Sequence, residues 1–143
     1  MCVSLSIPEV PVKIKVKTTI DHDETFELMV FGTYFEKGNS AYLRYEEAVE
    51  EGSVRTIVKM AHHNALILRG GAIKMRLPFE LNRKLNGSYE MPFGQFATVT
   101  KAKRIDYSYE NGKGHFGVVY DFSMEGAQAS TYELEIAFQE EKK

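Results

Sequence analysis

Apolar and polar residues alternate along most of this sequence, and that period of two restricts the possible folds more than any other feature. Alternate apolar residues run from Val12 to Ile20, with lysines between the first of them, and again from Phe116 to Met124. Successive side chains of a β-strand point to opposite sides, so the alternation is typical of strands with one buried face. The pattern predicts an all-β fold with little helix.

Turn residues separate the alternating stretches at the spacing of hairpins. Asn111-Gly112 is the strongest of these signals, because both residues adopt the positive φ that a two-residue hairpin turn requires. It predicts that Tyr107 lies opposite Phe116. A second two-residue turn is predicted at Gly38-Asn39, and a loop of odd length within Asp21 to Glu24.

The stretch from Asn64 to Phe79 carries the central hairpin of the prediction. Gly70-Gly71 is interpreted as its two-residue turn, since glycine adopts the required backbone angles freely. A loop before it, His62 to Asn64, would place Met60 opposite Leu66. The residues that this register predicts for the buried face are Leu66, Leu68, Ile73, Met75, Leu77 and Phe79.

Two segments interrupt the alternation, and a third is expected to shift it. Residues 46–52 contain four glutamates and predict a short helical turn or a solvated loop. Residues 81–86 are polar and predict a connection. Lys101 and Lys103 fall on the apolar face of a long strand, so a β-bulge is expected near Thr100 to Ala102.

At 143 residues the chain suits a single domain. About eight to ten strands joined by hairpin-length links favour an antiparallel up-and-down barrel over a strongly rolled sandwich. Pro8 and Pro11 disfavour regular structure, so residues 1–10 are predicted to form a flexible arm. The barrel is expected over residues 11–139, and a charged tail over residues 140–143.

Composition and charge argue against several kinds of partner. The formal net charge of -2 provides no global field that would attract nucleic acid. Cys2 is the single cysteine and cannot form an internal disulfide, which favours a reducing compartment. The N-terminus lacks a secretory leader, and no apolar run reaches the length of a membrane span. We therefore expect a cytoplasmic protein with no nucleic-acid or membrane partner.

Four segments carry a resemblance to a known family. They are Ala41–Glu47, Thr56–Lys59, Leu68–Ala72 with Lys74-Met75, and Tyr89–Gly94. Their residues and spacing resemble the YwiB-like family of small bacterial calycin-like (lipocalin-like) barrel proteins. The resemblance implies a meander barrel of the bacterial cytoplasm with no assigned biochemical role, and it carries over no catalytic residue. The chain has no tryptophan, so the first-strand motif of true lipocalins is absent, which argues against an extracellular carrier.

One glycine-rich motif has the spacing of a dinucleotide-binding loop, Gly112 to Gly117. Such a loop requires a following helix N-terminus to hold pyrophosphate, whereas an alternating strand pattern, Val118 to Met124, follows here. The motif is therefore interpreted as part of a hairpin, and no cofactor is predicted.

Metal ligands and catalytic groups are sparse. Asp21 to Glu24 offers carboxylates and one imidazole, but four consecutive residues cannot all converge on one ion, so a solvated turn is favoured. His62-His63 point to opposite sides of an extended chain and would share a metal only if the turn bends them together. No serine or cysteine comes with a placed base and orienting group. The sequence predicts no metal site, no catalytic residues and no enzyme activity.

The predicted registers place basic side chains on the face opposite the core. They are Arg55, Lys59, Arg69, Lys74 and Arg76. This basic face costs stability unless carboxylates or an anionic ligand offset its charge. Solvation with pairing to residues 46–51 is the favoured interpretation, and an anion-binding surface is the alternative. The strand after Glu24 is apolar on both faces, with Met29, Phe31 and Phe35 on the second, which suggests that something covers it.

The barrel interior supplies the first functional hypothesis, since a barrel of this size is either filled by its own side chains or holds one small molecule. We predict a non-enzymatic protein that binds a small, partly apolar or anionic molecule inside. The candidate ligand-binding residues are Tyr45, Tyr89 and Phe93 at the mouth, Arg69 as the polar contact, and Arg44 as a partner for interior tyrosine hydroxyls. The large side chains predicted to face the interior are Phe26, Tyr34, Tyr45, Phe116, Tyr120, Phe122, Tyr132 and Phe138.

The alternative hypothesis is a protein-interaction or regulatory module. It would use the basic face, with Arg55, Lys59, Lys74 and Arg76, or the apolar second strand as its contact surface. The sequence predicts no oligomeric state and does not identify a ligand.

Overall fold

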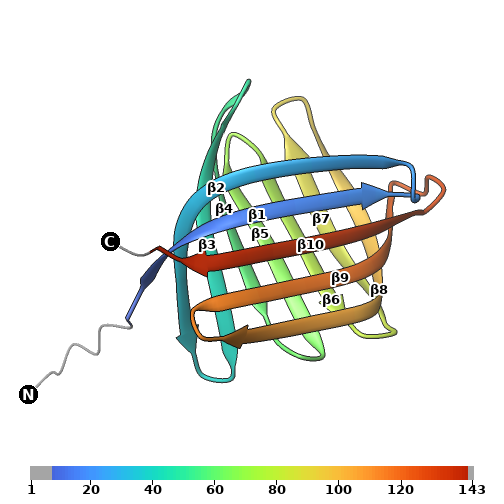
Figure 1. The fold of residues 1–143 in the computed structure, drawn as a ribbon. Helices are drawn as coiled ribbons and strands as arrows, with labels where there is room; N and C mark the ends of the chain where they lie inside the picture. The colour runs from blue at the N-terminus through green and yellow to red at the C-terminus, as the bar shows by residue number, and fades with distance from the viewer. Residues whose placement is uncertain (1–7, 142–143) are drawn as a thin grey trace, which may run out of the picture.

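Ten antiparallel strands make up nearly all of residues 8–141, the part of the chain that the computed structural model describes (Figure 1). They are β1 (Val10–Ile20), β2 (Glu24–Lys37), β3 (Ser40–Val49), β4 (Gly52–Met60), β5 (Asn64–Gly71), β6 (Lys74–Glu80), β7 (Lys84–Met91), β8 (Gly94–Glu110), β9 (Lys113–Met124) and β10 (Ser130–Glu140). Each strand pairs with the next along the chain, and β10 pairs with β1, so the sheet closes on itself. The predicted all-β up-and-down barrel is confirmed.

The barrel extends slightly beyond its predicted bounds. β1 begins at Val10 and β10 ends at Glu140, one residue outside the predicted range at each end. Cys2 and most of the predicted N-terminal arm lie outside the described residues. Within residues 8–141 there is no helix long and apolar enough to cross a membrane.

Two of the predicted two-residue turns have the strand registers that the sequence predicts. Tyr107 pairs with Phe116 across the turn at Asn111-Gly112, whose two residues have φ values of 54° and 77°. Gly38-Asn39 joins β2 to β3, with Lys37 opposite Ser40. In the second turn only Gly38 has a positive φ, 63°, which is the pattern of a two-residue turn with glycine at its first position.

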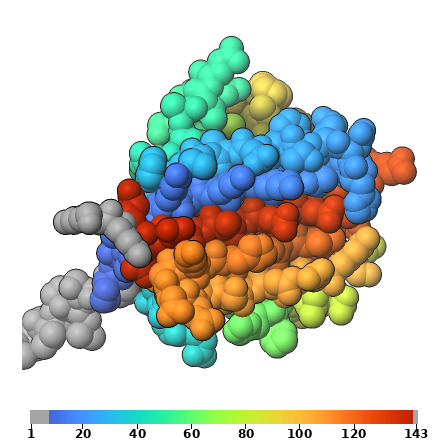
Figure 2. Space-filling view, in the orientation of Figure 1, coloured from blue at the N-terminus to red at the C-terminus, as the bar shows by residue number. Residues whose placement is uncertain are grey.

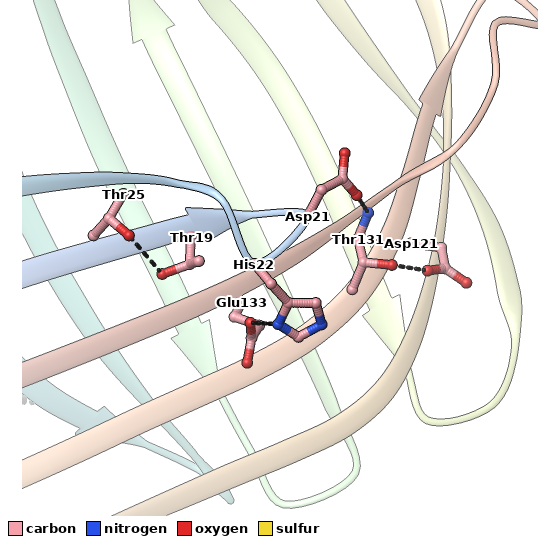
Figure 3. A network of polar contacts seen from close by, with 7 residues as sticks. All are labelled: Thr19, Asp21, His22, Thr25, Asp121, Thr131 and Glu133. Atoms are coloured by element: carbon pink, nitrogen blue, oxygen red, sulfur yellow. Dashed lines mark hydrogen bonds and ion pairs between the residues drawn. The ribbon is translucent and has the colours of Figure 1, made fainter.

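The odd-length loop between β1 and β2 is also confirmed, and its side chains hold the start of β10 (Figure 3). Thr131 donates its backbone N–H to Asp21 Oδ1 at 2.8 Å and its hydroxyl to Asp121 Oδ1 at 3.0 Å. His22 Nδ1 lies 3.1 Å from Glu133 Oε2. The polar residues of this loop therefore fasten one end of the barrel. In the described part of the chain, no three His, Cys, Asp or Glu side chains gather as a metal site.

The predicted turn at Gly70-Gly71 is wrong. Both glycines belong to the end of β5 and pair with β4, and the connection to β6 lies at Ala72 and Ile73. A Cβ on Gly71 would lie 2.4 Å from the Ser53 carbonyl oxygen, and its φ of +103° also disfavours other residues. Gly71 therefore serves a close approach to the neighbouring strand, whereas a Cβ on Gly70 would meet no atom within 4 Å.

This correction reverses the faces of β5. Met60 pairs with Ala65 rather than with Leu66, because Asn64 joins the strand instead of the loop. Leu66 and Leu68 therefore lie on the outer face, and Leu68 is 36% exposed. The inward residues of β5 and β6 are Ala65, Ile67, Arg69, Met75, Leu77 and Phe79.

The glutamate-rich segment is mostly strand, contrary to the prediction of a helical turn or loop. β3 continues to Val49 and β4 begins at Gly52, which leaves residues 50–51 between them. The tip of this hairpin projects from the barrel (Figure 1), where water reaches both faces and no apolar alternation is required. The connection predicted over residues 81–86 is shorter, because β7 begins at Lys84.

β8 contains a bulge close to the predicted place. Its register against β9 shifts between Ala102 and Arg104, one residue beyond the predicted segment. The shift turns Lys103 outward, where its Nζ lies 3.1 Å from Asp121 Oδ1. Burial alone would raise the pKa of Asp121, but hydrogen bonds from Lys103 and Thr131 lower it below its usual value. The bulge thus keeps a lysine out of the core.

β2 curves strongly along its length (Figure 1). It pairs with β1 from Glu24 to Tyr34, but with β3 only from Gly32 onward. A Cβ on Gly32 would lie 2.2 Å from the Arg44 carbonyl oxygen, so only glycine fits at this bend. The stretch before Gly32 has one free edge. Phe26 faces the inner side of this stretch but remains exposed, because β3 does not cover it.

Candidate functional site

One row of inward side chains crosses six neighbouring strands at the same level of the barrel. Its members, each paired with the next, are Tyr45, Thr56, Arg69, Met75, Tyr89 and Phe96. Cross-strand partners project on the same face, so these side chains are neighbours in space. The row brings together the predicted ligand-binding residues Tyr45, Arg69 and Tyr89.

Four members of the row, Arg69, Met75, Tyr89 and Phe96, line a cavity of about 330 Å³, whereas Tyr45 and Thr56 lie beside it and do not. The cavity is lined by Arg69, Met75, Leu77, Tyr89, Met91, Phe96, Tyr120, Phe122, Met124 and Tyr132. Aromatic rings and methionines make up most of this lining, and Arg69 is the charged member among the described residues that form it. The volume is at the lower end of the range of about 300–1,000 Å³ that is usual for ligand pockets. This end of the barrel is hollow enough for one small molecule.

Arg69 is only weakly paired. Its Nη2 lies 3.5 Å from Glu47 Oε1, the long limit for a hydrogen bond, and the two side chains are 31% and 17% exposed. Arg69 Nε and the hydroxyl of Thr56 are buried, and neither meets the geometry of a hydrogen bond within the described residues, although the Tyr45 hydroxyl lies near enough to both residues for them to lower its pKa. Buried polar atoms are nearly always paired, so these unused donors need a reason.

The positive charge of Arg69 affects the pKa of two tyrosine hydroxyls. Burial raises the pKa of the Tyr45 hydroxyl, and the guanidinium of Arg69 partly opposes that shift. Burial also raises the pKa of Tyr120, with Tyr132 adding to the shift and Arg69 opposing it. The rings of Tyr120 and Tyr132 stack with centroids 5.4 Å apart. These hydroxyls remain protonated at neutral pH and can donate hydrogen bonds.

Two other predicted ligand-binding residues lie elsewhere. Phe93 is 77% exposed in the turn between β7 and β8 and does not line the cavity. Arg44 lies on the outer face, where it pairs with Glu9 and its guanidinium sits 5.8 Å from the ring centre of Phe35. Neighbours in a strand alternate, and because Tyr45 points inward, Arg44 cannot reach the interior hydroxyls.

The basic face lies on the outer surface without Arg69, which the corrected register moves to the interior. Its members are Arg55, Lys59, Lys74 and Arg76. Lys74 Nζ lies 3.7 Å from Glu90 Oε2, and Leu68 lies beside Arg76 in the adjacent strand. The surface is therefore a mixture of basic and apolar side chains.

Sequence reasoning missed Glu47, Thr56 and Met91. Glu47 was assigned to a loop, although it follows Tyr45 by two residues and therefore shares its inward face once the strand continues. Thr56 lies directly opposite Tyr45, a contact that the register of β3 and β4 could have revealed. No comparable signal was available for Met91, because its role depends on strands distant in the sequence.

The opposite end of the barrel is closed by hydrogen-bonded tyrosines. The Tyr34 hydroxyl donates to Glu36 Oε2 at 2.7 Å and lies 2.5 Å from the Tyr107 hydroxyl. Tyr109 donates to Glu140, and its ring stacks on that of Tyr34 with centroids 4.4 Å apart. Each of these hydroxyls has a hydrogen-bond partner within the protein, so none of them requires a ligand.

The fold and the cavity define a small closed β-barrel protein with a hydrogen-bonded tyrosine cluster at one end, beside a pocket of about 250 Å³, and the larger, mainly apolar cavity at the other. The chain belongs to the DUF1934 family, a domain of unknown function, whose model matches residues 12–136. It is similar to the uncharacterized β-barrel protein YwiB of Bacillus subtilis (strain 168), with 31% identity over 134 residues, 92% of this chain and 94% of YwiB.

The crystal structure of the ywiB protein from Bacillus subtilis matches with a TM-score of 0.85 and 31% identity, over 94% of each chain. The predicted relationship to the YwiB-like family and the barrel are thus confirmed. The calycin-like and lipocalin-like part of that expectation stays a prediction.

Proposed function

We propose that this protein binds a small, mainly apolar molecule in the hollow end of its barrel and does not transform it. The observation that supports this function is the cavity of about 330 Å³ whose lining is aromatic and methionine-rich around one arginine. Small barrels are otherwise filled by their own side chains. A mainly apolar cavity at one end of a barrel whose other end holds a hydrogen-bonded tyrosine cluster favours a binding role.

The lining suits a flat or branched apolar molecule. Tyr89 and Phe96 lie on one wall, and the stacked pair Tyr120 and Tyr132 lies on another. Aromatic faces accept offset-stacked rings, and methionine side chains such as Met75 adapt to irregular shapes. The volume favours a compact ligand over a fully enclosed long lipid chain.

Binding of the neutral fluorescent dye Nile red tests this function. The variant Met75→Trp replaces a methionine that lines the cavity by the larger indole side chain. Leu68→Trp adds the same indole to the outer face of the adjacent strand. The parent protein and Leu68→Trp should bind the dye equally, and Met75→Trp should lose about tenfold or more in affinity. Equal binding by all three proteins, or none by the parent, would remove the proposed function.

Exposed apolar residues on β2 favour a second candidate function, contact with a protein partner. Met29 is 54% exposed and Phe31 is 61% exposed on β2. Figure 2 shows β2, β1, β10 and β9 side by side on one surface of the barrel. On β1, Lys13 and Lys15 lie directly opposite Phe31 and Met29. This combination of apolar and basic side chains suits an acidic partner surface with apolar residues.

A pair of variants separates the two functions. Replacing Met29 and Phe31 together by serine should abolish retention of a co-purifying partner and leave dye binding unchanged. Met75→Trp should have the opposite effect. A partner that is retained equally by both variants would exclude the β2 surface.

A further inference from the structure

Arg69 carries a charge that the protein itself compensates incompletely. Among the described residues, Glu47 is the carboxylate within ion-pair distance, and it makes one contact of 3.5 Å. A strong arginine–carboxylate pair makes two parallel hydrogen bonds of about 2.7–2.9 Å. The guanidinium therefore has capacity for a better partner than the one the fold supplies.

Two unused donors lie next to each other in the row of inward side chains, and Arg69 is the one of the two residues that lines the cavity. Thr56 is the direct cross-strand neighbour of Arg69, and both Thr56 Oγ1 and Arg69 Nε are buried without a partner among residues 8–141. An arginine N–H can only donate, and the threonine hydroxyl can do so as well. A ligand group that accepts hydrogen bonds can reach the guanidinium of Arg69, because this residue lines the cavity.

The rest of the lining restricts the ligand in two ways. Apart from Arg69, it is formed by aromatic and aliphatic side chains and the tyrosine hydroxyls, so the body of the ligand must be largely apolar. One arginine beside one glutamate also disfavours a doubly charged group, because the second negative charge would face Glu47 without a cation.

We propose, on the basis of the proposed function, that the ligand is a monocarboxylic acid with a compact apolar or aromatic body. Its carboxylate takes the place of Glu47 at the Arg69 guanidinium. Glu47 lies near the end of β3 at the projecting hairpin, where it can turn toward water (Figure 1). The apolar body lies against Tyr89 and Tyr120.

Two probes that share one aromatic body test this inference: 2-naphthoate, which carries the carboxylate, and 2-naphthylmethanol, which does not. Calorimetry should show that the parent protein binds the acid about tenfold more tightly or better, since a charge-assisted hydrogen bond is stronger than a neutral one. Arg69→Gln should lose this preference and retain its affinity for the alcohol.

The variant Glu47→Gln should change the affinity for the acid in the opposite direction, and it leaves the Arg69 guanidinium in place. It removes the competing carboxylate, so affinity for the acid should rise severalfold, while affinity for the alcohol stays constant. Arg55→Gln is the matched control, because it removes an arginine from the outer face of the neighbouring strand, and it should change neither affinity. Unchanged circular dichroism of each variant excludes loss of folding as the cause.

The outcomes distinguish the two levels of the proposal. If the parent binds both probes equally and Arg69→Gln changes nothing, the acid preference is overturned while the cavity-binding function stands. If Arg55→Gln alone weakens binding of the acid, the acid binds at the basic face and the inference is overturned. If neither probe binds, both the inference and the proposed function are overturned.

Discussion

β10 begins and ends in an aromatic cluster, and the two clusters behave differently. At its end, Phe138 stacks with Tyr34 and Tyr109, whose hydroxyls bond to carboxylates or to another tyrosine. At its start, Tyr132 stacks with Tyr120 beside a cavity and a weakly paired arginine. Aromatic residues alone therefore do not identify a binding site. The cavity and the weakly paired Arg69 are what distinguish the two clusters, and the proposed function rests on them.

The comparison also separates stability from function. Satisfied hydrogen bonds and stacked rings at the closed end lower the free energy of the folded state. Unpaired donors at the open end cost stability until a ligand accepts their hydrogen bonds. We therefore expect changes at the closed end to affect stability strongly, and changes at the open end to affect binding more than stability.

The largest expected effect follows from removing the central ring of the closed end. Tyr34→Ala should lower the free energy of unfolding by about 3–5 kcal/mol, because Tyr34 is buried, stacked on two rings and hydrogen-bonded. Tyr132→Ala, at the half-buried open end, should cost about half as much. Urea denaturation measures both values. Equal losses would show that the two ends do not differ in the way described.

A smaller effect is expected at alkaline pH. Burial, together with the hydrogen bond to Glu140, raises the pKa of Tyr109 to about 12, whereas an unfolded tyrosine ionises near pH 10. The folded state holds this proton more tightly, so the stabilisation is complete below about pH 10 and is lost as the pH rises toward 12.

Tyr109→Phe should remove that part of the alkaline loss of stability, which urea denaturation between about pH 9 and pH 12 would show. A variant that loses stability as steeply as the parent would exclude the Tyr109 hydroxyl as the titrating group. Tyr132→Phe is the comparison at the open end: burial, with Asp21 and Glu24 nearby, also raises the pKa of this hydroxyl, so the variant should remove a smaller part of the alkaline loss than Tyr109→Phe.

The smallest change in stability is expected for Arg69. Arg69→Met keeps an unbranched apolar side chain like the aliphatic part of arginine, and it removes both the weakly paired charge and the unpartnered Nε. Without ligand, the free energy of unfolding should change by less than about 1 kcal/mol. Thermal unfolding measures this difference. A loss well beyond that value would make Arg69 a structural residue, and its assignment to a binding site would lose its main support.

Most of the fold was predictable because two local signals agree. The alternation from Phe116 to Met124 and the turn at Asn111-Gly112 specify strand, face and register together. Around Gly70-Gly71 the signals conflict, since residues 65–68 are apolar on both faces and alternation does not select a register there. The alternation therefore could not predict whether Arg69 faces the interior or the outer surface of the barrel.

The cavity was less predictable than the strands that surround it. Its lining comes from strands between β5 and β10, and the hollow depends on which side chains meet across the barrel. Of the predicted ligand-binding residues, Arg69 and Tyr89 line the cavity, and Tyr45 lies in the same row of inward side chains without lining it. Phe93 was placed at the mouth because it is aromatic and near Tyr89, but a turn residue has no sheet to hold it inward.

A crystal structure of the protein with 2-naphthoate tests the central claim most directly, that the hollow end of the barrel is a binding site. We predict the naphthalene ring between Tyr89 and Tyr120, with the carboxylate within hydrogen-bond distance of the Arg69 guanidinium and Glu47 turned away. A cavity filled by its own side chains, with the acid absent or bound on the outer face beside Arg55 and Arg76, would contradict the claim.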